Sequence, residues 1–260
     1  MRYRGTTALV TGASSGIGRE FAATLAARGA DLVVTARRTE RLEELATELR
    51  RDHGVRVTVL PADLSRPRAG ATLRDALAAR GIRVSTLINC AGLGGTSALT
   101  EAGEDAVHDL VMVNVTALTD LTRAFLPEVL DAGDGAIVNI ASLVGHVPVP
   151  GMAVYAAGKA YVISFTEALA YELRDSPVRV LLLTIGSTRS EFFAASGTIE
   201  EGVRFQTPAQ VVATGMRALD AGRPPTEVVS GTINRVNLAV MRRLPRRLAL
   251  TLAARAARPA

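Results

Sequence analysis

Short apolar runs alternate along this chain with longer segments in which apolar residues recur at helical spacing. The apolar runs predict strands at 6–11, 31–36, 55–60, 84–89, 136–141 and 178–184. The segments with helical periodicity predict helices at 16–28, 39–52, 66–80, 103–130, 153–175 and 208–221. Such alternation is typical of a parallel sheet with helices on both faces. We therefore predict an α/β fold with a single, doubly wound parallel sheet in a three-layer α/β/α sandwich.

The pattern contains no internal repeat and no low-complexity linker, and 260 residues suit one α/β domain. We predict one domain over residues 1–234 and a separate tail over 235–260. The uncharged stretch 135–158 is long enough to span a bilayer, but its asparagine, glycines and prolines argue instead for a buried strand, a loop and a helix start. We expect no signal peptide, and the lone Cys90 excludes an intrachain disulfide, so a cytoplasmic protein is predicted.

The net charge of +5 is concentrated in the tail. Residues 235–260 hold seven arginines and no acid, so the remainder carries 23 basic residues against 25 acidic ones. This distribution predicts no general nucleic-acid surface. On a helical wheel, tail leucines and a methionine lie opposite arginines, which indicates a membrane-surface contact, a partner helix, or a helix packed on its own domain or another subunit. The two sides are Leu238, Met241, Leu244, Leu248 and Leu252 against Arg242, Arg243, Arg246 and Arg247. Pro245 interrupts the pattern and predicts the start of a second helix.

A glycine-rich segment, TGASSGIG at 11–18, joins the first predicted strand to the first predicted helix. Glycines at such a turn let the backbone approach a phosphate at a helix N-terminus. A flexible connection is the alternative, but the position between strand and helix favours phosphate binding. After the second strand, Ala36 stands where a carboxylate would bind the ribose hydroxyls of NAD, and Arg37 and Arg38 follow. Arginines suit the 2′-phosphate of NADP, so NADP(H) is preferred over NAD(H), unless both arginines simply begin a solvated helix.

Polar residues also follow or interrupt the later elements. Asp63, after the third strand, could accept a hydrogen bond from an adenine amino group or cap a helix. Small residues, 89–92, follow the fourth strand and leave room for a cofactor. Asn114 lies in an apolar helix, where an amide needs a partner. It could bind the backbone and open the helix locally, or be a satisfied core asparagine.

The candidate chemistry centres on Ser142, Tyr155 and Lys159. Tyr155 and Lys159 are four residues apart, which on a helix places both side chains on one face. Lys159 is the only lysine in the chain, and Ser142 follows the fifth strand. A free tyrosine has a pKa of about 10, and a cation at about 4 Å in a partly buried site could bring it toward neutrality. A surface tyrosine beside a helical cation is the alternative. However, the motifs all follow predicted strands, and the carboxyl ends of parallel strands share one edge where ligands bind.

Together these residues resemble the short-chain dehydrogenase/reductase family over about residues 6–232. The glycine segment, NCAG at 89–92, Asn114, Ser142, the Tyr155–Lys159 pair and the turn at 185–190 occur in the family's order. The resemblance implies a Rossmann-type domain that binds NAD(P) and transfers hydride between nicotinamide and a carbonyl or alcohol carbon.

The resemblance also implies the residue roles. Tyr155 would be the general acid for reduction, with its pKa depressed by Lys159, which would also hold the nicotinamide ribose. Ser142 would orient the carbonyl, Asn114 would support a proton path through water, and no metal is implied. The cofactor would contact, besides Tyr155 and Lys159, a set of residues along the edge: Gly12, Ser14, Ser15, Gly16, Ile17, Gly18, Arg37, Arg38, Asp63, Leu64, Asn89, Ala91, Gly92, Gly186, Thr188 and Ser190.

Two positions depart from the family's pattern. Cys90 replaces a common asparagine, and Ile185 replaces the usual proline before Gly186, which leaves that loop's backbone less constrained. The family also suggests a homodimer or homotetramer through the helices at 103–130 and 153–175.

Residues 187–207 lie where a lid over the substrate would sit. Their phenylalanines and nearby apolar residues predict an apolar ketone, aldehyde or secondary alcohol as substrate, although ordinary packing would explain any one of them. The predicted pocket residues are Leu93, Val144, His146, Val147, Met152, Phe192, Phe193 and Phe205. A catalytically idle binding or regulatory protein is disfavoured by the intact Ser142, Tyr155 and Lys159. Epimerisation or dehydration on the same scaffold would use the same residues and stays open.

Overall fold

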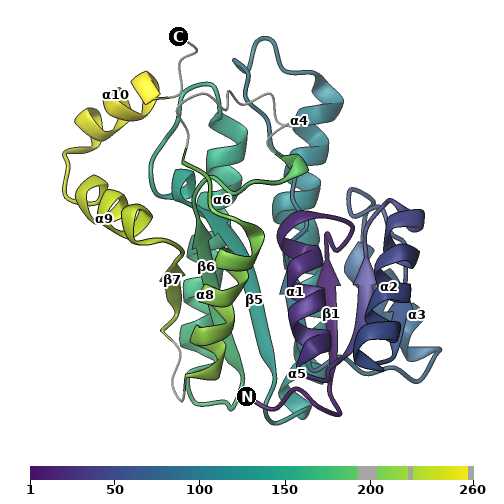
Figure 1. Cartoon of the computed structure of the whole chain (residues 1–260). Coiled ribbons are helices and arrows are strands. Elements are labelled where there is room, and N and C mark those ends of the chain that lie inside the picture. Colours follow the sequence, from purple (N-terminus) through teal and green to yellow (C-terminus); the bar gives the residue numbers. More distant parts are fainter. Residues whose placement is uncertain (193–203, 222–224, 257–260) are drawn as a thin grey trace.

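A parallel sheet forms the middle layer of the computed structural model, which describes residues 1–192, 204–221 and 225–256 (Figure 1). Within these residues the strand order is β3-β2-β1-β4-β5-β6-β7, and every pairing is parallel. The strands are β1 (Thr7–Thr11), β2 (Asp31–Thr35), β3 (Val57–Val59), β4 (Thr86–Asn89), β5 (Ala136–Ser142), β6 (Arg179–Ile185) and β7 (Glu227–Val229). The predicted α/β class and all six predicted strands are confirmed. The sequence pattern missed β7, because three residues at a sheet edge are too short to show a period.

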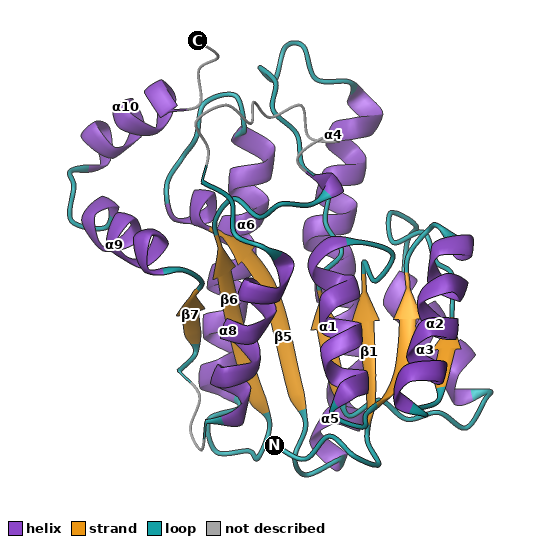
Figure 2. Ribbon diagram, viewed as in Figure 1, coloured by secondary structure: helices purple, strands orange, loops and turns teal. Residues whose placement is uncertain are grey.

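Helices cover both faces of the sheet, as Figure 2 shows. They are α1 (Gly16–Ala27), α2 (Thr39–His53), α3 (Ala69–Ala78), α4 (Glu104–Val111), α5 (Leu118–Asp131), α6 (Ala153–Glu172), α8 (Pro208–Asp220), α9 (Thr232–Met241) and α10 (Arg246–Ala256). Successive side chains of a strand point to opposite faces. In β1, Val10 packs with side chains of α1, α2 and α8, while Leu9 packs with those of α3 and α5. The central strand β1 therefore contributes to two separate cores.

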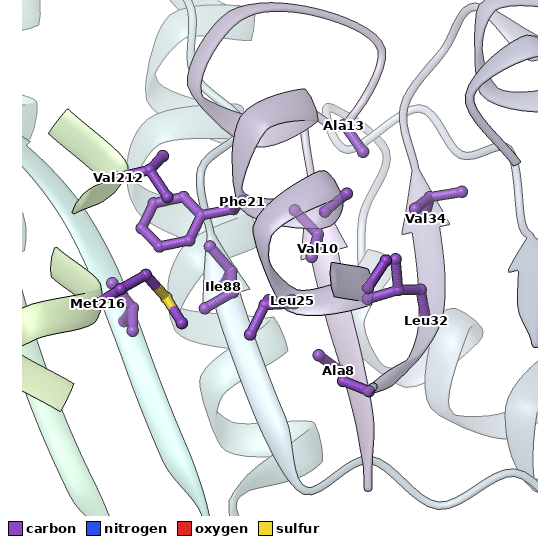
Figure 3. Close-up of a cluster of buried hydrophobic side chains, with 14 of the residues drawn as sticks. Ala8, Val10, Ala13, Phe21, Leu25, Leu32, Val34, Ile88, Val212 and Met216 are labelled. Carbon is purple, nitrogen blue, oxygen red and sulfur yellow. The ribbon is translucent and has the colours of Figure 1, made fainter. Parts of the chain in front are cut away.

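The first of these cores joins α1 and α8 to the sheet, and Figure 3 shows it. Phe21 and Leu25 of α1 and Met216 of α8 are all fully buried there. Full burial of a side chain of this size stabilises the fold by about 1.5–3 kcal/mol. This packing fixes α1, and with it the glycine-rich turn that precedes α1, against the carboxyl ends of the strands.

The predicted helix at 103–130 is interrupted by a π-helical turn, Met112–Ala117, between α4 and α5. Asn114 lies in this turn and is 1% exposed. Its side-chain Oδ1 accepts a hydrogen bond from Leu93 N at 2.8 Å, and its Nδ2 donates to Leu93 O at 2.8 Å. The asparagine thus binds the backbone, and the helix opens locally, as one of the two sequence interpretations held.

The chain reverses its direction of winding between β1 and β4. β1 and β4 pair with each other. The strands that follow β1 extend the sheet toward one edge, and the strands that follow β4 extend it toward the other edge. A crevice at the carboxyl ends is expected at such a switch point.

Candidate active site

One cavity of about 600 Å³ runs along the carboxyl ends of the strands. All the predicted catalytic and cofactor residues lie on its wall except Asn89 and Asn114. Residues from the ends of six strands, β1 to β6, therefore meet at one edge, as their positions in the sequence predict.

At two positions of the glycine-rich turn there is no room for any side chain larger than the hydrogen of glycine. A Cβ at Gly18 would lie 2.4 Å from Gly12 O, and one at Gly12, whose φ is +68°, would lie 3.0 Å from Ala91 N. The backbone of this turn thus packs closely on the loop after β4 and opens toward the cavity at the N-terminus of α1. This cradle fits a dinucleotide diphosphate, for which Gly12, Ser14, Ser15, Gly16, Ile17 and Gly18 would supply the contacts.

Arg38 lies after the end of β2 and binds residues on both sides of the cavity. Its guanidinium donates to Ser14 Oγ at 3.0 Å and to Glu191 Oε2 at 2.7 Å. Arg41 also pairs with Glu191. Glu191 follows β6, so this ion-pair cluster connects the two sides of the cavity at the end where Arg37 also lies.

Asp63 forms a tight turn rather than a helix cap. Its Oδ1 accepts hydrogen bonds from Ser65 N at 3.0 Å and Ser65 Oγ at 2.9 Å, and these bonds lower the carboxyl pKa. The helix predicted to start at 66 begins only at Ala69. The capping interpretation is therefore wrong, and Asp63 lies with Leu64 on the cavity wall.

Asn89 faces the core instead of the cavity. Its Nδ2 donates to Asn139 Oδ1 at 2.9 Å and to Thr122 Oγ1 at 3.1 Å, and Asn139 in turn donates to Thr166. Asn89 is therefore absent from the cavity wall, and its contact with the cofactor stays a prediction. Position 89 ends β4 with its side chain on the α5 side, whereas Ala91 and Gly92 reach the cavity.

Ser142, Tyr155 and Lys159 come together at the far end of the cavity from Arg38. Ser142 is the last residue of β5, and Tyr155 and Lys159 lie in the first two turns of α6. Ser142 and Tyr155 both lie on the cavity wall, and Ser142 acts to lower the pKa of the Tyr155 phenol. Lys159 Nζ lies 5.8 Å from the centre of the Tyr155 ring and donates to Ile140 O at 3.0 Å. That bond uses one of three ammonium hydrogens, so two remain for other acceptors.

Burial dominates the electrostatics of this triad. It raises the pKa of Tyr155 to about 12, with the Ser142 hydrogen bond acting in the opposite direction, and it lowers the pKa of Lys159 to about 8. The sequence predicted a depressed tyrosine pKa. In the chain itself the desolvation of the phenol outweighs any effect of the lysine, and Tyr155 stays protonated at neutral pH.

Cys90 lies on the cavity wall near the triad, whereas His146, predicted as a pocket residue, does not. Burial raises the pKa of the Cys90 thiol to about 12, so the cysteine is neutral beside the cavity. His146 is not on the cavity wall; its Nε2 lies 3.0 Å from Glu227 Oε1, and Glu227 also accepts from Arg242 at 2.8 Å. The histidine therefore joins the turn after Ser142 to β7 and α9.

Beyond the triad the cavity wall is mostly apolar. Of the predicted pocket residues, Leu93, Val144, Met152 and Phe192 line it; Val147 and Phe205 do not, and Phe193 lies outside the described residues. The Phe192 ring is 5.9 Å from the Tyr155 ring. Val113 of the π-helical turn and Asp109 of α4 also reach the wall, although neither was predicted. In the sequence their spacing could not be distinguished from that of any other helical residues.

A family model for short chain dehydrogenases matches residues 6–200. The chain belongs to the short-chain dehydrogenase family. It is 39% identical to sulfoacetaldehyde reductase 2 of Chromohalobacter salexigens over 71% of this chain and 73% of that one. It is 35% identical to 7beta-hydroxysteroid dehydrogenase of Clostridium sardiniense over 71% of this chain and 70% of that one.

Solved structures of this family show the same fold. A short-chain dehydrogenase from Sphingobium yanoikuyae in complex with NADPH is similar over 93% of this chain and 97% of its own, with 33% identity and a TM-score of 0.78. A family member from Burkholderia phymatum in complex with NAD is similar over 93% of this chain and 94% of its own, with 26% identity and a TM-score of 0.82. This dehydrogenase is thus an NAD(P)-binding oxidoreductase by family.

Proposed function

We propose that this short-chain dehydrogenase is an NADPH-dependent carbonyl reductase that acts on apolar ketones or aldehydes. One observation carries the proposal: Ser142, Tyr155 and the buried Lys159 lie together on the wall of one cavity. The cavity continues from there to the glycine-rich turn and Arg38.

The chain's own residues supply the proton for reduction. Tyr155, protonated at neutral pH, donates its proton to the substrate oxygen, and the Ser142 hydroxyl donates a hydrogen bond that orients the same oxygen. When bound, NADPH supplies the hydride that the carbonyl carbon receives, so the carbonyl becomes an alcohol. Lys159 holds a hydroxyl of the nicotinamide ribose with its remaining ammonium hydrogens and stabilises negative charge on the phenol as the proton leaves.

The preference for NADPH rests on the arginines after β2. Arg37 and Arg38 lie on the cavity wall, and Ala36 stands where a carboxylate would select NAD. Arginine binds a phosphate monoester through two parallel charged hydrogen bonds. We infer that this pair holds the 2′-phosphate, and that Glu191 must release Arg38 when it does.

The preference for an apolar substrate rests on the wall around Phe192. Among the described residues that line this end, Leu93, Val144 and Met152 are apolar, Asp109 is acidic, and no arginine is present. The Asp109 carboxylate on this wall disfavours an anionic substrate such as a sulfonate. The wall instead favours a bulky ketone of the kind a hydroxysteroid dehydrogenase reduces.

The reductase is further proposed to act as a homodimer or homotetramer in the cytoplasm. Helices at 103–130 and 153–175 would form the contact between copies. On these helices Val111 and Tyr161 are exposed, and the Tyr161 ring stacks on Phe165 at 5.8 Å.

Consumption of NADPH with a panel of carbonyl compounds tests the proposal. We expect turnover with bulky apolar ketones, weaker turnover with NADH, and little with sulfoacetaldehyde or small sugars. Reduction of only polar or anionic carbonyls would contradict the substrate assignment. An absence of net NADPH oxidation with every carbonyl compound would contradict the reductase assignment and favour an idle or isomerising protein.

A further inference from the structure

The two C-terminal helices, α9 and α10, carry most of the large apolar side chains that are exposed on the described part of the protein. Ten such side chains are exposed among the described residues, and six of them belong to α9 and α10: Ile233, Val236, Val240, Leu248, Leu250 and Leu252. Apolar residues exposed singly are ordinary, but a group of this kind on adjacent helices marks a contact surface.

On α9 the exposed residues form one stripe. Ile233, Val236 and Val240 are 53–57% exposed and recur at helical spacing, while Leu238 on the opposite side is 5% exposed and packs on the domain. On α10, Leu248 and Leu252 are four apart and share one side. The predicted interruption at Pro245 is confirmed, since residues 242–245 separate α9 from α10, but the predicted apolar side is corrected at Leu238, which is buried rather than exposed with the others.

Arginines without acidic partners surround these apolar residues. Arg242 pairs with Glu227, but no carboxylate in the described part of the chain lies within ion-pair distance of Arg235, Arg243, Arg246 or Arg247. The tail from 235 onward has no acid at all. A second copy of the tail placed against it would bring like charges together, so the complementary partner is anionic.

We propose that α9 and α10 form a docking face for an anionic membrane surface. Exposed apolar side chains flanked by arginines bind lipid by burying the apolar groups at the headgroup boundary while the cations contact anionic headgroups. Among the described residues no helix has the length and apolar composition to cross a bilayer. The face therefore lies on the surface of the membrane.

This docking face is tied to the active site. Arg242 Nη2, at the end of α9, lies 3.2 Å from His146 Nδ1, and His146 closes the short 3₁₀ turn that begins directly after Ser142. Figure 1 shows α9 and α10 beside the β7 edge, with α10 toward the carboxyl ends of the strands. A docked enzyme would thus keep its cavity next to the lipid that dissolves an apolar substrate.

Co-sedimentation of the full-length protein with vesicles tests the docking face. We expect the protein to pellet with vesicles that mix phosphatidylcholine and phosphatidylglycerol, to stay in solution with phosphatidylcholine alone, and to be released by salt. Replacing Val236, Val240 and Leu248 together by Ser should weaken this binding about tenfold or more. Leu99→Ser, which removes a 63% exposed apolar side chain from the loop before α4, should leave it unchanged.

A second pair of variants separates charge from apolar contact. Arg243→Gln with Arg247→Gln should weaken binding to the mixed vesicles, whereas Arg4→Gln with Arg80→Gln, which changes the net charge equally elsewhere, should not. None of these residues lies on the active-site cavity, so NADPH turnover without lipid checks that each variant is folded. Wild-type protein that fails to bind anionic vesicles overturns the proposal. Equal binding by the tail variants and the control variants also overturns it. A tail variant that binds vesicles like the wild type but changes the sedimentation of the oligomer would place a second copy on this face instead.

Discussion

Asn234 of α9 packs against the backbone of Gly186, in the loop that follows β6. A Cβ at position 186 would lie 2.5 Å from Asn234 Nδ2. Asn234 itself is fixed, because its Nδ2 donates to Ser230 O at 2.7 Å and to Gln206 Oε1 at 3.1 Å. Helix α9 therefore braces the loop after Ile185, the residue that replaces the family's proline.

Gly186→Ala should destabilise the protein by about 1–3 kcal/mol, since the added methyl group must displace Asn234. Urea unfolding measures the change. Gly103→Ala is the matched control, because a Cβ there meets no atom within 4 Å. Adding Asn234→Ala to Gly186→Ala should cost less than the sum of the two single changes. Additive costs would show that the two residues are independent.

The buried ammonium of Lys159 should give the enzyme a pH dependence. Because burial lowers its pKa to about 8, kcat/KM for NADPH at saturating ketone should fall as the pH rises through about 8. The affinity of Tyr155→Phe for NADPH should show the same pH dependence, because Lys159 is the group that titrates. A profile that stays flat to about pH 10, the ordinary lysine range, would contradict the assignment, as would an inflection that disappears with the tyrosine hydroxyl.

Glu191 should weaken the binding of NADPH by competing for Arg38. In Glu191→Gln the arginine loses its anionic partner, so the dissociation constant for NADPH should fall several-fold while that for NADH stays unchanged. Fluorescence titration at low and high salt measures both, and the gain should shrink with salt because Glu191 is half exposed. Equal changes for NADPH and NADH would show that Glu191 holds the cavity closed rather than competing with a 2′-phosphate.

Glu227 should contribute stability that is lost in acid. Burial alone would raise its pKa, but hydrogen bonds from His146, Arg242 and Thr184 lower the pKa to about 2. A carboxyl with a depressed folded-state pKa stabilises the fold above its unfolded pKa of about 4.3, and the contribution disappears as the pH falls toward 2. The stability difference between wild type and Glu227→Gln should therefore shrink between neutral pH and about pH 3. Exposed Glu43→Gln is the control, and a constant difference would contradict the account.

The strands and most helices could be predicted because their hydrophobic periods are long and regular. The convergence of Gly12, Arg38, Ser142 and Tyr155 on one edge was also predictable, since each follows a parallel strand or lies on the helix after it. Asn89 could not be placed, because the last residue of a strand can face either side of the sheet. The raised pKa of Tyr155 depends on burial, which spacing does not report, and the Glu191–Arg38 contact joins residues far apart in the sequence.

The central claim is that the Tyr155 hydroxyl donates the proton that completes carbonyl reduction. Single-turnover reduction of an apolar ketone by the NADPH complex tests it most directly, with Tyr155→Phe compared against Tyr161→Phe on the same helix. Tyr161 is not on the cavity wall, and its hydroxyl lies 2.9 Å from Thr119 Oγ1. We predict that Tyr155→Phe slows the turnover by about 10²–10⁴-fold with NADPH binding preserved, and that Tyr161→Phe leaves it unchanged. Turnover by Tyr155→Phe at the wild-type rate would contradict the account.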